Sequence, residues 1–360
     1  MLRDCRDRRR NFVRGLPARF SRFRMFAAVP ALVVLLAGAL SSGCRHSEEP
    51  VSREELGLFD TLIEIRAYGK NAKKAVNQAF DEFRRLHNLL NAYDPNSEIS
   101  KVNSNAGRAP VKVSSDTLEV VDRALYFARI SGGAFDPTVL PLAKLWNVGA
   151  ENPRVPEEED IRNALALVDY RKVLVDRENS TIFLEVPGMG LDLGAIAKGY
   201  AVDKAVSVLR KNGVNSFLIN AGGNVYVSGK KPGETLWRVG ITDPLADPSG
   251  TETYLGIFTG TDISVVSSGD YQRYFEVNGV RYHHILDPKT GYPAKNLKGT
   301  TVIGVSSTDC DGLSTTLFVV GVDKGKEILS AFPGVGAIFV KADGSIEMTP
   351  NLKDKVKLER

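Results

Sequence analysis

The sequence predicts an α+β protein with mixed, largely antiparallel sheets and segregated helices. Amphipathic helical patterns lie mostly before residue 216, whereas runs with strand-like alternation dominate after it. Turn dipeptides such as Asn278-Gly279 and Asp343-Gly344 separate several of these runs, as is typical of hairpins. Strand runs set apart from helix runs favour α+β over a doubly wound α/β fold.

The elements follow in chain order. Residues 60–68 alternate like a strand, and 71–90 carry one apolar stripe that predicts a helix. Further helices are predicted at 117–131, in a piece ending at Trp146, and at 161–168, and a strand pair at 172–175 and 181–186. Residues 189–193 resemble a strand end that feeds a helix beginning near Ile196. The later strands are predicted at 216–220, 224–228, 236–241, 254–258, 263–267, 272–277, 281–286 and 301–306. Helices at 313–320 and 323–332 and a hairpin over 336–348 complete the chain.

The N-terminus predicts export. An apolar run over 25–43 follows a basic segment and ends in small residues before Cys44. We therefore expect residues 1–43 to be a signal peptide and Cys44 to be lipidated, which places the protein on the extracytoplasmic (periplasmic) side of a bacterial membrane. A plain signal peptide or an anchor helix remains the alternative. Residues 44–56 are the predicted lipidated Cys and polar tether, 57–350 the folded domain, and 351–360 a charged C-terminal tail.

Charge and cysteine content exclude several function classes. Residues 1–24 contribute +7 to the formal net charge of +4, so the remainder is mildly acidic and no nucleic-acid partner is predicted. Only Cys310 would remain as a free thiol in the mature domain, which excludes a disulfide framework and a thiolate zinc site. Glycines at 188, 190 and 194 are wrongly spaced for a dinucleotide fingerprint.

Three stretches carry polar groups suited to catalysis. Asp192 and Lys198 flank a predicted strand-to-helix joint, where free helix-start amides would suit an anion. Asp311, predicted at a helix start, shares a face with Thr315 one turn later, and these oxygen ligands suit Mg²⁺. Adjacent strand residues face opposite sides, so only one of the pair His283 and His284 can face a site.

Several motifs occur in one order along the chain. They are Leu90 to Ser100 (LNAYDPNSEIS), Gly133-Ala134-Phe135-Asp136-Pro137, Asp192 to Tyr200 (DLGAIAKGY), Asn220-Ala221-Gly222-Gly223, Ser267-Ser268-Gly269-Asp270-Tyr271, His284 to Gly291, and Asp311-Gly312-Leu313-Ser314-Thr315. Together they resemble the ApbE-type FAD:protein FMN transferases, over about residues 57–348. The resemblance implies the flavin-transferase fold of that family for the domain over 57–350.

The resemblance also implies an activity and a set of site residues. FAD is split at its pyrophosphate, FMN passes to a Thr hydroxyl of an acceptor protein, and AMP leaves, with Mg²⁺ required. The acceptor would be a membrane or extracytoplasmic redox protein. The implied metal ligands are Ala195 through its carbonyl, Asp311 and Thr315, with Ser314 at a position where the family often has Asp. The implied FAD contacts are Phe59, Tyr93, Ala134, Phe135, Asp136, Asp192, Lys198 and Leu286.

Two roles and two alternatives complete the sequence-based predictions. His284 is the candidate base for the acceptor Thr proton, with Asp270 the next candidate. Tyr93 offers a face for stacking on flavin or adenine. The alternatives are an FAD pyrophosphatase that uses water as acceptor and yields FMN and AMP, and a lipoprotein that binds FAD without turnover.

Overall fold

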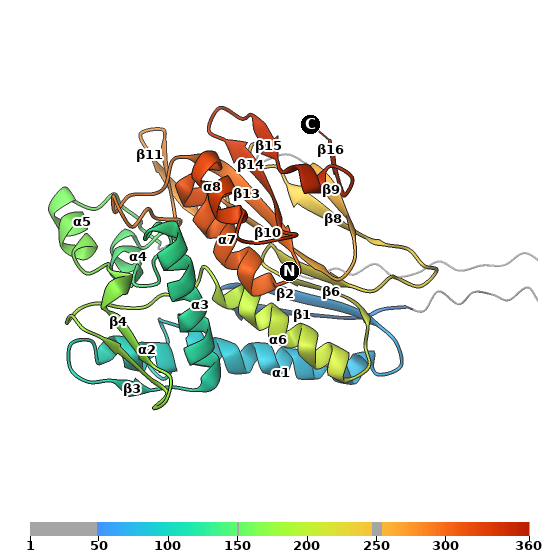
Figure 1. Cartoon of the computed structure of the whole chain (residues 1–360), viewed down its shortest axis with the longest axis horizontal. Helices are drawn as coiled ribbons and strands as arrows, with labels where there is room; N and C mark the ends of the chain where they lie inside the picture. Colours follow the sequence, from blue (N-terminus) through green and yellow to red (C-terminus); the bar gives the residue numbers. More distant parts are fainter. Residues whose placement is uncertain (1–48, 150, 247–253, 360) are drawn as a thin grey trace, which may run out of the picture. The chain divides into compact units, whose positions relative to one another are not determined.

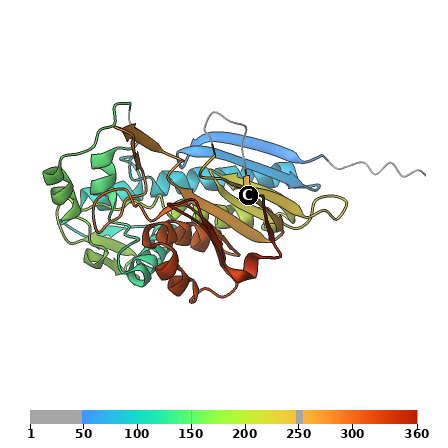
Figure 2. The ribbon, with the colours of Figure 1, turned by 90° about the horizontal axis from the view of Figure 1, so that it is seen from above.

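An eight-stranded sheet organises the structure, a computed structural model that describes residues 49–149, 151–246 and 254–359. The strand order is β1-β2-β6-β7-β10-β13-β14-β15, and every neighbouring pair is antiparallel, which confirms the α+β prediction. The strands are β1 (Val51–Leu58), β2 (Thr61–Tyr68), β6 (Ser216–Ala221), β7 (Asn224–Ser228), β10 (Ile263–Gly269), β13 (Leu297–Gly304), β14 (Gly336–Lys341) and β15 (Ile346–Met348). Figure 2 shows this sheet running from β1 and β2 (blue) to the red C-terminal strands.

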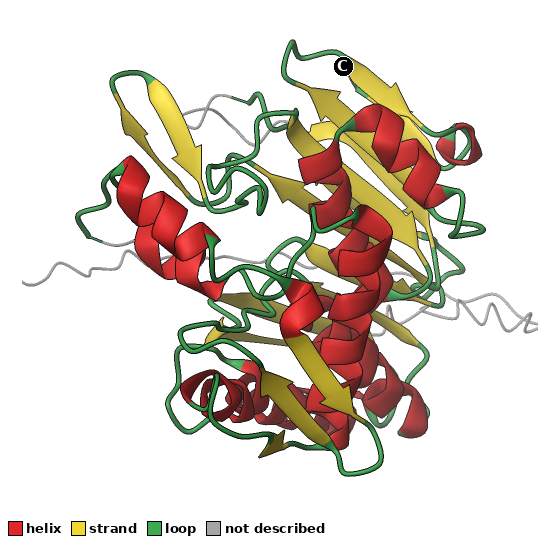
Figure 3. Cartoon of the chain, turned by 60° about the vertical axis from the view of Figure 1, so that its left-hand side comes forward, coloured by secondary structure: helices red, strands yellow, loops and turns green. Residues whose placement is uncertain are grey.

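Helices cover one face of this sheet. They are α1 (Ala72–Leu90), α3 (Ser115–Ser131), α6 (Ala197–Lys211), α7 (Ser307–Val320) and α8 (Val322–Leu329). Ile63, Ile65 and Ala67 alternate along β2 and are buried in the same apolar core as Phe83 of α1 and Ala201 of α6. The alternate apolar side chains of the strand therefore pack against the apolar stripes of the helices in one core. Figure 3 shows the central helices (red) in front of the strands of the main sheet (yellow).

A three-stranded sheet covers part of the other face. Its order is β16-β9-β8, from β16 (Val356–Leu358), β9 (Tyr254–Gly260) and β8 (Trp237–Thr242). Trp237, Val239 and Phe258 pack in a second core against side chains from β7, β10, β13 and β14, namely Val227, Val265, Ile303, Ile338 and Val340. No residue of β1 or β2 is among the buried members of that core.

Smaller elements form the remaining part of the domain. They are α2 (Glu98–Ser104), α4 (Leu140–Trp146), α5 (Glu158–Leu165), the sheet of β3 (Val111–Lys112), β5 (Thr181–Leu184) and β4 (Val173–Asp176), the hairpin of β11 (Tyr274–Val277) and β12 (Val280–His283), and the 3-10 turns Tyr170–Lys172 and Pro350–Leu352. Trp146 centres a third core with Ile161 and Leu286, and its indole N–H donates to the Gly291 carbonyl at 2.7 Å. This contact fixes the turn that follows His284.

The predicted chain ends need two corrections. The predicted signal peptide over 1–43 and Cys44 lie outside the described residues. Val51–Leu58, placed mostly in the predicted tether, is instead strand β1, paired with β2. The charged residues of this segment suggested a linker. Strand β1 lies at the edge of the sheet, where charged side chains are tolerated, and Glu55 forms an ion pair with Arg84 of α1. The predicted C-terminal tail contains β16, where Val356 is buried against the second core.

Three internal predictions also need correction. Residues 189–193 form no strand: only Gly190 makes an isolated bridge, to Val139, and the Asp192 N–H donates to the Pro137 carbonyl at 2.8 Å. Helix α7 begins at Ser307 and not at residue 313, because Ser306 caps it by accepting from the Asp309 N–H. Helix α2 was not predicted.

Within the described residues, no helix has the length and apolar character needed to span a bilayer.

Candidate active site

A cavity of about 1100 Å³ opens beside strands β2, β6 and β10, the first turn of α6, and Asp311 and Thr315 of α7. Twelve of the thirteen predicted catalytic, flavin and metal residues line it. They are Phe59, Tyr93, Ala134, Phe135, Asp136, Asp192, Ala195, Lys198, His284, Leu286, Asp311 and Thr315. The structure thus brings together side chains spread over more than 250 residues of sequence, and Ser314 is the exception.

Asp311 joins the two helices at the centre of the site. Its side chain is almost fully buried, in the second turn of α7 and not at the helix start as predicted. One carboxylate oxygen, Oδ2, accepts the Gly199 N–H of α6 at 2.8 Å. The other, Oδ1, lies 3.7 Å from the Lys198 ammonium. Asp311 is therefore both a docking contact between helices and a charged group at the cavity wall.

The start of α6 differs from the prediction of free amides. The Ala197 N–H donates to the Leu193 carbonyl at 2.8 Å, and the Gly199 N–H donates to Asp311. The anion that the helix start attracts is thus the protein's own carboxylate. Lys198 keeps its ammonium at the cavity, where it donates to the Gly194 carbonyl at 3.0 Å.

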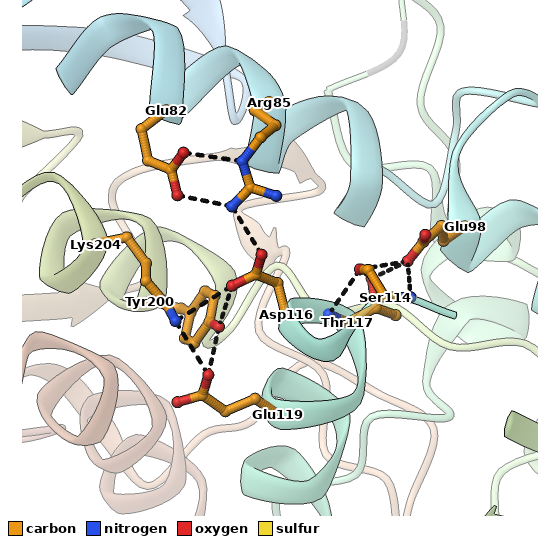
Figure 4. A network of polar contacts seen from close by, with 9 residues as sticks. All are labelled: Glu82, Arg85, Glu98, Ser114, Asp116, Thr117, Glu119, Tyr200 and Lys204. Atoms are coloured by element: carbon orange, nitrogen blue, oxygen red, sulfur yellow. Dashed lines mark hydrogen bonds and ion pairs between the residues drawn. The ribbon is translucent and has the colours of Figure 1, made fainter. Parts of the chain in front are cut away.

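A polar network holds α6 against α1 and α3 (Figure 4). Asp116 of α3 accepts from Arg85 of α1 at 2.7 Å, from the Tyr200 hydroxyl at 2.7 Å and from Lys204 at 3.2 Å. Burial alone would raise the pKa of Asp116, but the hydrogen bonds from Tyr200, Arg85 and Lys204 outweigh it and lower that pKa. The network fixes the helix that carries Lys198 two residues before Tyr200.

Ser314 does not line the cavity, whereas Ser268, to which the sequence assigned no role, does. Ser314 is fully buried; its hydroxyl donates to the Asp311 carbonyl at 2.9 Å and lies 2.8 Å from the Ser268 hydroxyl. Ser268, on β10, lines the cavity 3.5 Å from the Thr315 hydroxyl. The motif that contains Ser268 was identified in the sequence, but only the pairing of β10 beside α7 reveals its place in the site.

Tyr93 and Asp192 form the exposed wall of the cavity. The Tyr93 ring is 56% exposed, and its hydroxyl donates to Asp192 Oδ2 at 3.2 Å. Asp192 Oδ1 accepts the Gly194 N–H at 2.8 Å. Burial of the hydroxyl and the nearby carboxylate both raise the pKa of Tyr93, so the phenol stays protonated and remains a donor. An exposed ring held at its tip is available for stacking on a planar ligand.

Asp136 shapes the opposite wall through its hydrogen bonds. Its Oδ1 accepts from the N–H and the hydroxyl of Thr138 at 2.8 and 2.6 Å, and its Oδ2 accepts from the Tyr170 N–H at 3.0 Å. Burial raises the pKa of Asp136, and these donors oppose the rise. Its carboxylate therefore holds the loop that presents Ala134 and Phe135 to the cavity.

Phe59 lies in a strained turn between β1 and β2. Both Phe59 and Asp60 have positive φ angles, of 52° and 55°. Such a pair normally favours Asn and Gly, and its persistence in other residues is typical of functional sites. The Phe59 N–H donates to His87 Nδ1 at 3.0 Å, and the two rings meet edge to face. His87 supports the turn, a role that its position in a regular helix did not reveal.

The two histidines occupy different environments, as predicted. His283 is buried; its Nε2 donates to the Ala294 carbonyl at 2.8 Å, and its Nδ1 accepts the Ile285 N–H at 3.2 Å. His284 lines the cavity, and its Nδ1 donates to the Arg273 carbonyl at 3.3 Å. That tautomer leaves Nε2 unprotonated. Burial, with the Arg273 cation as second cause, lowers the pKa of His284 to about 3.

The sequence also matches a family model, described as the ApbE family, over residues 59–339. The chain belongs to the ApbE family. The matched range contains every described residue of the candidate site, from Phe59 to Thr315. The family match therefore covers the predicted site residues.

Individual relatives agree with this membership. The chain is 37% identical to an FAD:protein FMN transferase of Treponema pallidum, over 92% of this chain and 95% of that protein. It is 40% identical to an FAD:protein FMN transferase of Klebsiella pneumoniae, over 80% of this chain and 89% of that protein. Its structure matches that of an ApbE protein from Thermotoga maritima with a TM-score of 0.78 and 33% identity, covering 87% of this chain and all of that one. The antiparallel fold with segregated helices is thus that of the family.

The donor groups around Asp311 fit a hard cation. Among the described residues, no three His, Cys, Asp or Glu side chains gather in a metal-binding cluster. The cavity instead offers the Asp311 carboxylate, the Thr315 hydroxyl and the segment containing the Ala195 carbonyl. Oxygen ligands of this kind suit Mg²⁺, which keeps several waters and binds through few protein ligands. The Lys198 ammonium beside Asp311 indicates that positive charge is favourable there.

Proposed function

We propose that this protein transfers FMN from FAD to a threonine hydroxyl of an acceptor protein, in a Mg²⁺-dependent reaction that releases AMP. One observation carries the proposal: a single cavity holds a neutral imidazole, a buried carboxylate beside a lysine, and an exposed aromatic ring. The family relatives named as FAD:protein FMN transferases support the same reaction. The acceptor itself is inferred to be a membrane or extracytoplasmic redox protein.

The protein groups around the pyrophosphate supply positioning and charge. Asp311, Thr315 and the Ala195 carbonyl would hold Mg²⁺, which would neutralise charge on the transferred phosphoryl group. Lys198 contributes a second positive charge from the first turn of α6. Phosphoryl transfer needs alignment and electrostatic stabilisation more than covalent catalysis, so these groups match its demands.

His284 accepts the proton of the acceptor threonine. As the hydroxyl oxygen forms its bond to the FMN phosphorus, the bond from that phosphorus to the bridging oxygen breaks and AMP leaves with that oxygen. The hydroxyl proton passes to His284 Nε2, because Nδ1 already donates to the Arg273 carbonyl. A positioned base of this kind contributes about 10²–10⁴-fold to rate.

Tyr93 bears on the choice between transfer and hydrolysis. Its ring borders the cavity between the flavin side and solvent, so a smaller residue there would admit water. We expect Tyr93→Asn to raise free FMN at the expense of labelled acceptor. The decisive measurement follows FMN, AMP and the intact mass of a candidate acceptor together, with FAD and Mg²⁺. FMN without labelled acceptor would identify a pyrophosphatase, and FAD binding without AMP would identify a carrier.

We further infer that residues 1–43 are a signal peptide and that Cys44 carries the lipid anchor of an extracytoplasmic lipoprotein. The apolar run followed by small residues and a cysteine supports this. Cys44→Ser should move the protein from membranes to the soluble extracytoplasmic fraction. The reason is that the lipid on Cys44 would be the only membrane attachment of the mature protein, and the variant cannot carry it. A variant that stays in the membrane would instead indicate an uncleaved anchor helix.

A further inference from the structure

The cavity has a second arm that the predicted flavin and metal residues do not reach. Its floor is the uncovered face of the main sheet, including Arg66 of β2 and Asn220 of β6. Its wall is strand β8, with Trp237 and Arg238. The total of about 1100 Å³ exceeds the range of roughly 300–1,000 Å³ typical of small-molecule sites. The cavity therefore extends beyond the predicted flavin and metal residues, over β2 and β6 and along β8.

The wall of this arm is the edge of a sheet. Strand β8 pairs with β9 and, among the described residues, with no other strand. Five of its six residues line the cavity, and these include sequence neighbours whose side chains point to opposite faces. Side chains from one face alone could not produce that pattern. The edge of β8, with its backbone groups, faces the arm.

The register identifies which backbone groups are available. The Thr259 N–H donates to the Lys355 carbonyl at 3.0 Å, so Thr259 directs its backbone groups towards β16. In an antiparallel sheet, alternate residues direct their N–H and C=O to opposite sides. Phe258 therefore faces β8, where it pairs with Val239. It follows that Arg238 and Gly240 direct their N–H and C=O away from β9, into the arm.

We propose that this arm binds the acceptor protein as an extended segment that pairs with the edge of β8. The proposal rests on the proposed transferase function and adds how its protein substrate is held. An extended chain satisfies the backbone groups of Arg238 and Gly240 by strand addition. The arm is continuous with the cavity that holds His284, so a threonine in that segment reaches the base.

Charge in the arm selects the segment. Three cationic side chains line the arm: Arg66, Lys231 and Arg238. Among the described lining residues of β2, β8 and the β7–β8 connection, Glu64 is the one acidic side chain. Glu64 is already paired with Arg66. The remaining cations favour an acceptor segment with acidic residues beside the target threonine. Rim charges of this kind act on encounter and specificity, and their effect weakens with salt.

The test uses short synthetic peptides with one threonine flanked by Asp, Lys or Ala, incubated with the enzyme, FAD and Mg²⁺. FMN addition is read by mass, and AMP release is followed in parallel. We expect Asp-flanked peptides to be labelled in preference to Lys-flanked peptides. Arg238→Glu should remove or reverse this preference by raising the KM for peptide and not the KM for FAD. Lys357→Glu, an exposed charge reversal on β16 outside the cavity lining, should leave both unchanged.

A pair of variants isolates the backbone contact. Arg238→Ala removes the side chain and keeps the N–H, whereas Arg238→Pro removes both; an edge strand tolerates proline where its N–H is unpaired. We expect kcat/KM for peptide to be about fivefold lower for Arg238→Pro than for Arg238→Ala, the effect of one main-chain hydrogen bond. Equal values, or no preference for Asp, would overturn the proposal. Labelling of an intact candidate acceptor protein, with no labelling of any peptide, would also overturn it. FAD cleavage that labels neither peptide nor protein would refute the proposed transferase function, and so would no FAD cleavage at all.

Discussion

Gly199→Ala tests whether the close contact of α6 and α7 builds the active site. A methyl group at Gly199 would lie 2.7 Å from both the Ser307 carbonyl carbon and Asp311 Cβ, and nearer still to the Ser307 oxygen. Backbone atoms cannot rotate away, so the helices must separate. In an open helix this change gains up to about 1 kcal/mol. Here overpacking costs about 1–3 kcal/mol, so we expect a net loss of stability of up to about 2 kcal/mol.

The same displacement should reduce activity more than it reduces stability. Separating the helices stretches the hydrogen bond from the Gly199 N–H to Asp311 and moves Lys198 relative to that carboxylate. Denaturant unfolding gives the free energy of unfolding, and FMN transfer is measured on the folded variant. Gly325→Ala is the matched control, because its added methyl group meets only side-chain carbons in α8's neighbours, at 3.1 Å or more. A Gly199→Ala protein with wild-type stability and transfer would refute this account of the helix contact.

Four further predictions concern individual side chains. Asp311→Ala should lose most Mg²⁺-dependent turnover and also about 1–3 kcal/mol of stability, because the buried Gly199 N–H loses its acceptor, so turnover is measured on the folded protein; full activity with unchanged Mg²⁺ dependence would exclude Asp311 as a ligand. His284, the proposed base, accepts a proton only when neutral, and burial lowers its pKa to about 3, so kcat/KM for transfer should stay level as the pH falls through 6.5 to about 5; a decline centred near 6.5 would contradict this. His284→Ala should depress transfer strongly while FAD affinity stays near wild type, which a fluorescence titration checks. Because the pKa of Asp116 is lowered in the folded state, its stabilising effect is present above its unfolded pKa of about 3.9 and is lost at lower pH. Asp116→Asn should therefore lower the free energy of unfolding by about 1–2 kcal/mol at neutral pH, with the difference shrinking below pH 4 in acid titrations.

Periodicity predicted the elements whose burial follows a simple pattern. The stripe of α1 and the alternation of β2 each have one buried face, so sequence spacing alone locates them. Strand β1 escaped prediction because it lies at a sheet edge, where charged residues such as Glu55 find partners on α1. The start of α7 was placed too late because small and polar residues are buried there against α6, without an apolar stripe.

Site residues that belong to sequence motifs could be predicted. Contacts between segments far apart in the sequence could not. Asp311, Lys198 and His284 stand in motifs that the sequence shows directly. The bond between Asp311 and the Gly199 N–H joins residues 112 positions apart, so no local pattern reveals it. His87 and the open edge of β8 were missed for the same reason, since a register and a turn conformation are properties of the folded sheet.

Asp311 has two roles, one in helix packing and one proposed in catalysis, and this limits how the sequence can change during evolution. A chain that lost this carboxylate would lose the proposed cation ligand and the bond that docks α6 on α7 in one step. Drift towards an inactive flavin carrier is therefore easier through His284 or Lys198, whose side chains donate to single carbonyls at the cavity wall. In related proteins that have lost FAD turnover, we expect an aspartate at the position of Asp311 to be retained, because helix packing still requires it.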